Sequence, residues 1–234
     1  MAISAPVAKQ RRTGGSATRR PPLNRQRVLE AALAVVDREG LDQLTIRQLG
    51  IELGVEGMSL YKHVADKDAV LDGIVELLWA EVPANPGPEA DWRQALGELA
   101  GGLRALFQRH PKVAPLLVSR NFINASALRC WDAYLQVLQR AGFERQRALD
   151  AICAIGTQGL GYGLMELQCL GPVAEGGQAE SQIQRLRRVT RSLPADLPDA
   201  LVELAMDLSG QCDFDRCFTI AVDAVLGGVR PPAG

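Results

Sequence analysis

The chain has 234 residues, of which 47% are hydrophobic and 23% charged, and this composition is typical of a globular protein with an apolar core. It excludes a uniformly disordered, collagen-like or disulfide-scaffold chain, and no apolar run approaches the ~20 residues that cross a bilayer. Five dispersed cysteines, at positions 130, 153, 169, 212 and 217, favour reduced thiols, and the basic N-terminus lacks the apolar region of a secretory signal. We therefore expect a cytoplasmic protein with no membrane partner.

The net charge of −1 hides an asymmetry along the chain. Residues 1–67 hold eleven Lys and Arg against seven Asp and Glu, whereas residues 68–234 hold fifteen against twenty. A basic N-terminal part favours a polyanionic partner. Residues 1–22 contain several Arg, Gly, Ser and Pro and no acid, so we predict a disordered basic arm there. This arm is either an inert solvated tail or a segment that adds affinity for nucleic acid.

The first predicted helix begins after Asn24, a good N-cap residue, and ends at Gly40. Its apolar residues recur with the spacing of one helix face. They are Val28, Leu29, Ala32, Val35 and Val36. A second, short helix is predicted from the capping-box pair Thr45 and Gln48 to Gly54.

A third short segment follows over 57–63, and Asp66 can cap a fourth helix. We predict a small helical domain over 23–66, a connecting helix over 67–82, and a Pro-rich linker over 83–89. A larger domain is expected over 90–228, with a tail at 229–234. Its predicted helices are 90–109, 111–118, 124–141, 144–169, 179–191, 197–208 and 212–227. No segment alternates with period two, so the predicted fold class is all-α.

The second and third segments, joined by Gly54-Val55-Glu56, have the spacing of a helix-turn-helix. Leu49, Val55 and Leu60 would then form a small core. The opposite side of the third segment is left free to enter the major groove of DNA. Small residues and a methionine on that side permit close approach to bases, and Met58 can contact a thymine methyl group.

The stretch from Leu44 to Leu71, LTIRQLGIELGVEGMSLYKHVADKDAVL, resembles the DNA-binding domain of TetR-family transcription regulators. The Leu-Tyr-x-His-Val form at 60–64 is similar to that of the tetracycline-repressor branch. Weaker similarity continues through Ala141-Gly-Phe143 and the last helix. The resemblance implies a regulator, a repressor by family default, that binds a palindromic operator as a homodimer and is released by a small effector.

The resemblance also implies the residues that contact DNA. They are Ile46, Arg47, Gly57, Met58, Ser59, Tyr61, Lys62, His63 and Lys67. Arg47 is expected to reach a guanine edge, and the last four residues to hold the phosphate backbone. Tyr61 and His63 also fit ordinary surface or core positions of a three-helix unit. Gly57 and Met58 differ from the polar and proline residues of the tetracycline repressor, so its operator sequence is not transferred.

Several glycines in the predicted 144–169 helix indicate a close helix–helix approach. Gly156, Gly159 and Gly163 lie on one face, and the resemblance implies that this helix and the last one pair with the partner subunit. The predicted dimer interface is Gly156, Gly159, Gly163, Phe218 and Val222. A phosphate-binding Gly loop is disfavoured, because no strand precedes these glycines and no Gly-Lys-Ser/Thr follows.

The resemblance implies an effector pocket in the larger domain, and an apolar or aromatic effector fits the residues available. The candidates are Phe107, Leu117, Phe122, Trp131, Tyr134, Gln158, Tyr162, Met165 and Gln168. Each of them alone also fits a core position. Leu117 stands roughly where the tetracycline repressor has the histidine for its magnesium–drug complex, so tetracycline is not the expected effector.

Two readings from other classes are open. The chain has two histidines and shows no zinc spacing or nucleophile motif, so we expect no enzyme, no cofactor and no metal site. Thiol oxidation could replace the effector as the signal through Cys130, Cys153 or Cys169. Buried cysteines, however, usually behave as small apolar residues.

Overall fold

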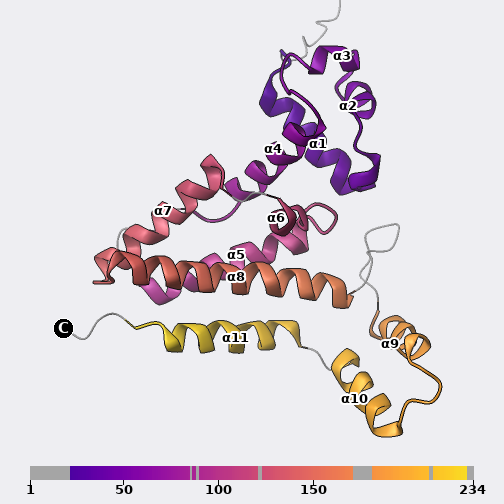
Figure 1. The fold of residues 1–234 in the computed structure, drawn as a ribbon, viewed down its shortest axis with the longest axis vertical. Coiled ribbons are helices and arrows are strands. Elements are labelled where there is room, and N and C mark those ends of the chain that lie inside the picture. Colours follow the sequence, from indigo (N-terminus) through magenta and orange to yellow (C-terminus); the bar gives the residue numbers. More distant parts are fainter. Residues whose placement is uncertain are drawn as a thin grey trace, which may run out of the picture.

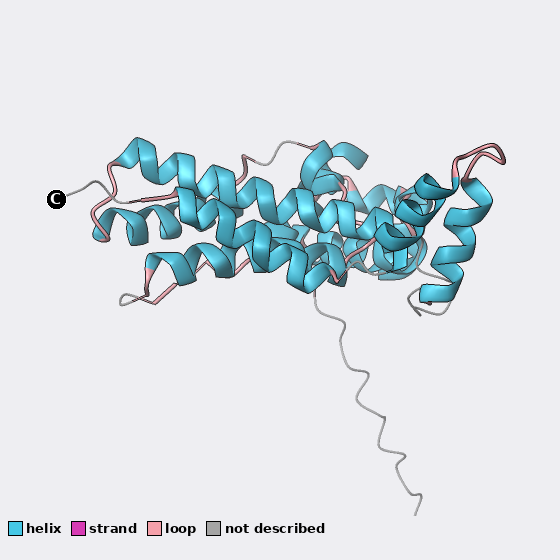
Figure 2. Cartoon of the chain, turned by 90° about the horizontal axis from the view of Figure 1, so that it is seen from below, coloured by secondary structure: helices cyan, strands magenta, loops and turns pink. Residues whose placement is uncertain are grey.

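A computed structural model describes residues 22–84, 86–87, 90–120, 123–170, 181–210 and 213–230. Within these ranges the chain forms helices and loops, with no strand (Figures 1 and 2), as the predicted all-α class requires. The predicted arm, apart from residue 22, and the candidate Phe122 lie outside the described residues. Among the residues described, no helix is both long and apolar enough to span a membrane.

The N-terminal unit consists of four helices and one short 3-10 turn. They are α1 (Arg25–Glu39), η1 (Leu41–Gln43), α2 (Ile46–Leu53), α3 (Gly57–Leu60) and α4 (Lys67–Ala80). Three helix starts follow from side chains that replace the missing backbone partners of the first turn. Asn24, Thr45 and Asp66 each accept a hydrogen bond from the backbone N–H three residues later. These predicted N-caps are confirmed.

Within the described residues, seven further helices follow the linker. They are α5 (Trp92–Arg109), α6 (Leu116–Ser119), α7 (Ala125–Arg140), α8 (Arg145–Leu170), α9 (Gln182–Ser192), α10 (Asp199–Gly210) and α11 (Phe214–Gly228). Six of them match predicted helices within three residues at each end. The predicted 111–118 helix is wrong, because residues 111–115 form turns and α6 begins only after Pro115. Proline lacks the N–H that a helix interior needs, so the helix starts beyond it.

Helices α5 and α8 form the centre of the larger domain, with α11 lying along α8 and α7 connecting to α4 (Figure 1). Buried apolar residues run as one cluster from Val28 in α1 to Leu226 in α11. Trp79 of α4 and Trp131 of α7 meet with ring centroids 5.5 Å apart, which joins the two parts. Helices α9 and α10 pair with each other and project from the body.

The α8 glycines allow a close approach within one chain. A Cβ at Gly159 would lie 2.7 Å from the Ala100 carbonyl oxygen in α5, and one at Gly163 would lie 2.6 Å from the Phe107 ring. A Cβ at Gly156 would lie 2.8 Å from the Trp131 ring of α7. The close packing inferred from these glycines is therefore present, but its partners are α5 and α7 of the same chain.

The two α11 residues predicted at the dimer interface also face the chain's own helices. The Phe218 ring packs edge-on against Tyr162 of α8 at a centroid distance of 5.2 Å, and Val222 is buried. Together with the glycines, these positions are filled by intrachain packing. Helical periodicity gave their common face, but it carried no information on which helix covers that face.

Candidate nucleic-acid interface and effector domain

The turn between α2 and α3 depends on two glycines. Gly54 ends α2 with φ +67°, a left-handed conformation that glycine adopts without strain. A Cβ at Gly50 would lie 2.9 Å from the Val55 carbonyl oxygen and 3.1 Å from the Gly57 nitrogen. Because both contacts are to backbone, only glycine lets α2 and α3 approach this closely. Sequence reasoning missed Gly50, although a glycine inside a short amphipathic helix was the available signal.

Beneath the turn between α2 and α3, the structure contains the small core that the sequence predicts. Leu49 and Leu60 are fully buried, and Val55 is half-buried against them. Burying these side chains fixes the rotation of α2 and α3, so that their remaining faces point away from the core. Between those faces lies an open hollow.

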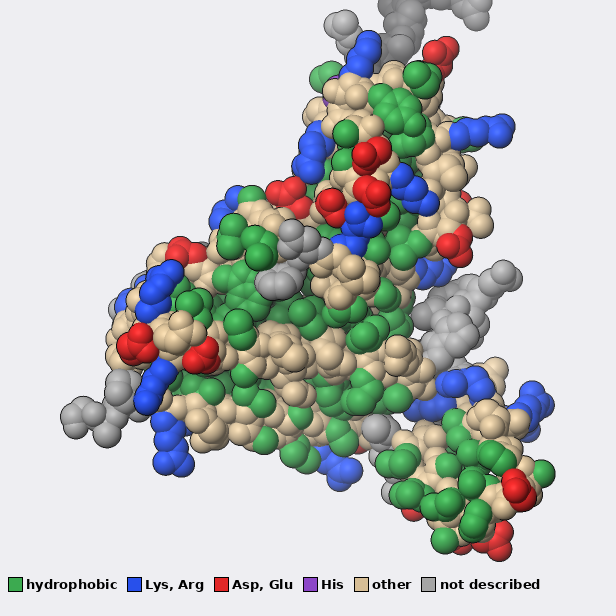
Figure 3. Space-filling view, in the orientation of Figure 1, with side chains coloured by type: hydrophobic (Ala, Val, Ile, Leu, Met, Phe, Trp, Pro, Cys, Tyr) green, Lys and Arg blue, Asp and Glu red, His purple; other side chains and the backbone are tan. Residues whose placement is uncertain are grey.

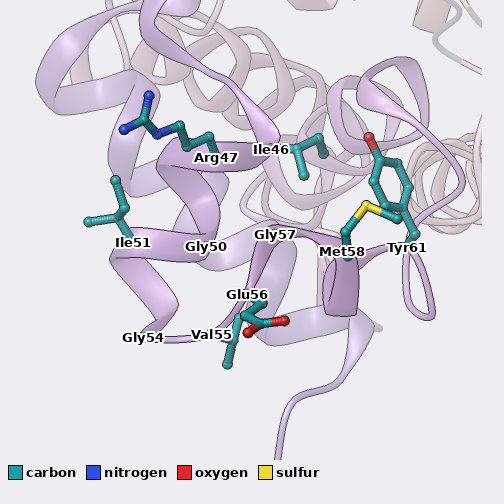
Figure 4. Close-up of a pocket in the computed structure, with 10 residues that line it drawn as sticks. All are labelled: Ile46, Arg47, Gly50, Ile51, Gly54, Val55, Glu56, Gly57, Met58 and Tyr61. Carbon is teal, nitrogen blue, oxygen red and sulfur yellow. The ribbon is translucent and has the colours of Figure 1, made fainter.

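Figure 4 shows this hollow with its lining side chains. Its lining residues are Ile46, Arg47, Gly50, Ile51, Gly54, Val55, Glu56, Gly57, Met58 and Tyr61. Arg47 and Ile51 project from one face of α2, and Met58 and Tyr61 stand at α3 and its end. Five of the nine predicted DNA-contact residues therefore line this hollow, and no lysine does.

The predicted DNA-contact residues differ in how freely they project. Those that are exposed are Arg47, Met58, Tyr61, Lys62 and Lys67, whereas Ile46, Gly57, Ser59 and His63 are half-buried. The Ser59 hydroxyl donates a hydrogen bond to the Glu56 carbonyl oxygen at 2.6 Å. That bond uses its hydroxyl proton, so Ser59 is left to accept hydrogen bonds.

The predicted effector residues differ in how deeply they are buried. Phe107, Leu117 and Tyr134 lie in the core, and the Tyr134 hydroxyl donates a 2.5 Å hydrogen bond to the Pro83 carbonyl oxygen. Burial raises the pKa of this phenol, so Tyr134 stays a hydrogen-bond donor that anchors the α4–α5 linker. Trp131 and Gln158 are half-buried, Tyr162 is buried, and Met165 and Gln168 are exposed.

Sequence reasoning missed a buried ion pair that joins α5 to α8. Arg104 donates two hydrogen bonds to the Glu166 carboxylate, at 2.6 and 2.9 Å, and both residues are more than 90% buried. Gln108 donates to the same carboxylate, and the Arg104 guanidinium reaches Asp215 of α11 at 2.8 Å. The hydrogen bonds that Arg104 donates to Glu166 raise the pKa of Arg104, so its guanidinium keeps its charge.

Contacts between the N-terminal unit and the larger domain gather around His110, which caps the C-terminal end of α5. Its Nδ1 lies 2.7 Å from Asp37 of α1, and its Nε2 lies 3.2 Å from Glu81 at the end of α4. On the other side, Arg120 donates to Asp72 and Asp68 of α4.

A helix-turn-helix on a small helical unit, coupled through α4 to a larger helical domain, defines a DNA-binding transcriptional regulator with a separate regulatory domain. Comparison with known proteins agrees. Residues 85–231 match the family model described as the tetracycline repressor-like C-terminal domain. Because this match covers more than half of the chain, the protein belongs to the TetR family.

Similar proteins of known name include transcriptional repressors. The chain is 28% identical over 215 residues to the HTH-type transcriptional repressor DrrR1 of Streptomyces coeruleorubidus, covering 90% of this chain and 78% of that protein. It is 30% identical to the class D tetracycline repressor protein of Escherichia coli, covering 88% of both chains. The structure of Streptomyces coelicolor ActR in complex with actinorhodin superimposes with a TM-score of 0.68 at 26% identity, covering 89% of this chain and 97% of that one. The predicted function of a ligand-responsive repressor is confirmed at the level of the family.

Proposed function

We propose that this protein represses transcription as a homodimer on a palindromic operator and leaves the DNA when a largely apolar or aromatic effector binds. The proposal that the protein binds DNA is supported by the exposed hollow between α2 and α3. Arg47 lines this hollow, and a buried core lies behind it. Two such units in a symmetric dimer would read half-sites about one helical turn of DNA apart.

Within each unit, the residues have distinct roles. Arg47 can form two parallel hydrogen bonds to a guanine edge. Ile46, Gly57, Met58 and Ser59 line the major groove, and Tyr61, Lys62, His63 and Lys67 contact the phosphate backbone. Phosphate contacts fix the position of the protein but carry no sequence information, so base selection rests on the first group.

For dimerisation, we propose the outer face of α8 together with that of α11. Ala154, Thr157 and Gly161 are exposed on α8 and repeat with the spacing of one helix face. Ile220 of α11 is 61% exposed, and Ala224 follows one turn later. Small side chains let a second pair of helices approach closely, as in the four-helix arrangement that the family resemblance implies.

An effector of apolar or aromatic character is supported by the larger domain. Leu117 is a buried apolar residue, so it offers no metal ligand where the tetracycline repressor has a histidine. ActR, a similar protein, has been crystallised with actinorhodin. The effector would act by favouring a conformer in which the two DNA-reading units are wrongly spaced, with α4 transmitting the change.

The base-reading role of Arg47 is tested by Arg47→Ala. We expect operator affinity to fall about fivefold or more, because a bidentate guanine contact is worth about 1–3 kcal/mol and 1.4 kcal/mol corresponds to tenfold. Affinity for random duplex DNA should fall only slightly. Fluorescence anisotropy on both duplexes measures the two losses, and Arg140→Ala, which removes an exposed arginine from α7, is the control. Equal losses on operator and random DNA would refute base readout by Arg47.

A further inference from the structure

Two large apolar side chains project into solvent on the surface proposed to read DNA. Met58 is 76% exposed and Ile51 is 64% exposed. Single exposed apolar residues are common on protein surfaces. These two, however, line the same hollow as Arg47, and Figure 4 shows Ile51 on the same face of α2 as that arginine. The hollow therefore joins one guanidinium to two apolar groups.

The charges around the hollow favour bases over phosphates as its occupants. Among its lining residues, Arg47 is the one cation and Glu56 the one anion, and both side chains are exposed. A carboxylate at the rim repels phosphate groups, whereas the lysines Lys62 and Lys67 lie outside the lining. The apolar part of the hollow therefore suits base edges better than phosphate groups.

The major groove offers one prominent apolar group, the C5-methyl of thymine. We propose that Ile51 and Met58 read thymine methyl groups beside the guanine that Arg47 contacts. Arg47 and Ile51 are four residues apart, slightly more than one helical turn and about 6 Å along α2. With about 3.4 Å per base pair, the thymine read by Ile51 lies within roughly two base pairs of that guanine. This inference rests on the proposed function and adds to it the chemistry of the half-site.

The test begins with a duplex selected by the full-length protein from a randomised library. In this duplex, each thymine near the conserved guanine is then replaced singly by deoxyuridine, which removes the methyl group and leaves every hydrogen-bonding group in place. We expect at least two positions at which the replacement lowers affinity by about fourfold, the equivalent of exposing one methylene-sized apolar group.

Each methyl group is then assigned to a side chain with Ile51→Ala and Met58→Ala. Each variant should bind the thymine and deoxyuridine duplexes equally at one position and keep the fourfold difference at the other. Met58→Leu, which stays apolar, should retain sensitivity to the methyl group. Leu128→Ala removes a 55% exposed leucine from α7 and should behave like the unaltered protein.

The outcomes separate this inference from the proposed function. A library that yields no enriched sequence would overturn the proposed function itself. An enriched palindrome whose affinity ignores every deoxyuridine replacement would overturn only the methyl readout. Variants that keep full sensitivity at both positions would likewise exclude Ile51 and Met58 as the reading groups. Thermal unfolding of each variant checks that the fold is intact.

Discussion

At the scale of single residues, burial decides which side chains can act and which only pack. Cys130 is fully buried, and the absence of water around it raises the pKa of its thiol to about 11. Cys153 and Cys169 are exposed on α8. Since the thiolate is the reactive form, Cys130 is the least suited of the three to sense an oxidant.

We predict that Cys130 does not react with an aromatic disulfide reagent at pH 8 in the folded protein. With a pKa near 11, only about one thiol in a thousand is ionised at that pH, and burial blocks access to it. Titration before and after denaturation, with Cys130→Ser as the comparison, counts the protected thiol. If the native unaltered protein and native Cys130→Ser have the same number of reactive thiols, the prediction holds. Fast modification of Cys130 in the native protein would make thiol oxidation a candidate signal again.

The buried pair Arg104 and Glu166 is a second feature decided by burial. Removing one partner leaves the other charge buried without its counter-ion, so Glu166→Ala should lower the free energy of unfolding by about 3 kcal/mol. Asp215 does not compensate fully, because its side chain is 89% exposed and its attraction is screened by water.

Urea unfolding at one fixed protein concentration measures this loss. The double variant Arg104→Met with Glu166→Leu removes both charges and should recover most of the stability. A double variant as unstable as Glu166→Ala would instead assign the loss to packing.

At the scale of helices, the contact between α5 and α8 is set by backbone approach. A Cβ at Gly159 would meet the Ala100 carbonyl oxygen at 2.7 Å and its Cα at 3.0 Å, and neither atom can move without shifting α5. Gly159→Ala should therefore destabilise the protein by about 2 kcal/mol.

Gly101→Ala on α5 is the matched control, because no atom lies within 4 Å of its added methyl group. That control should be neutral or stabilising by ~0.5–1 kcal/mol, as helix propensity predicts. Thermal unfolding compares the two, and similar shifts would argue against close backbone contact.

Helix positions were predictable from the sequence because their signals are local. Asn24 and Thr45 start helices through hydrogen bonds to residues three positions away, and periodic apolar residues define each buried face. The partner of a face is not local information. The shared face of the α8 glycines could be predicted, but its contact with α5 depends on packing between segments some 60 residues apart. The Arg104–Glu166 pair and the His110 contacts were missed for the same reason.

The candidate DNA interface could be predicted more completely than the effector residues. The residues predicted to contact DNA lie within one short stretch, 46–67, in which local turns fix the geometry. Gly50 shows the limit, since its role follows only from the approach of Val55 and Gly57 to within about 3 Å. The effector candidates are spread from Phe107 to Gln168, and apolar type alone does not separate a pocket wall from a core.

At the scale of the whole molecule, residues 110–120, which follow α5, connect the larger domain to the N-terminal unit. His110 lies between Asp37 and Glu81, Lys112 donates to the Arg38 carbonyl oxygen at 2.6 Å, and Arg120 binds two carboxylates of α4. One oxygen of the half-buried Asp37 carboxylate has no hydrogen-bond partner, and the other lies 2.7 Å from His110 Nδ1. Displacement of the segment would therefore turn α1 and α4 together, and with them the hollow.

We predict that His110→Ala lowers operator affinity roughly fivefold without changing the salt dependence of binding. Losing the contacts with Asp37 and Glu81 frees the DNA-binding unit to rotate, and binding must then order it again at an entropic cost. No phosphate contact is removed, so the slope of log affinity against log salt concentration stays the same.

Lys62→Ala is the contrasting variant, because loss of a phosphate contact should reduce that slope by about one. Anisotropy titrations at several salt concentrations distinguish the two effects. Unchanged affinity in His110→Ala would mean that other contacts, such as the packing of Trp79 on Trp131, orient the unit without it.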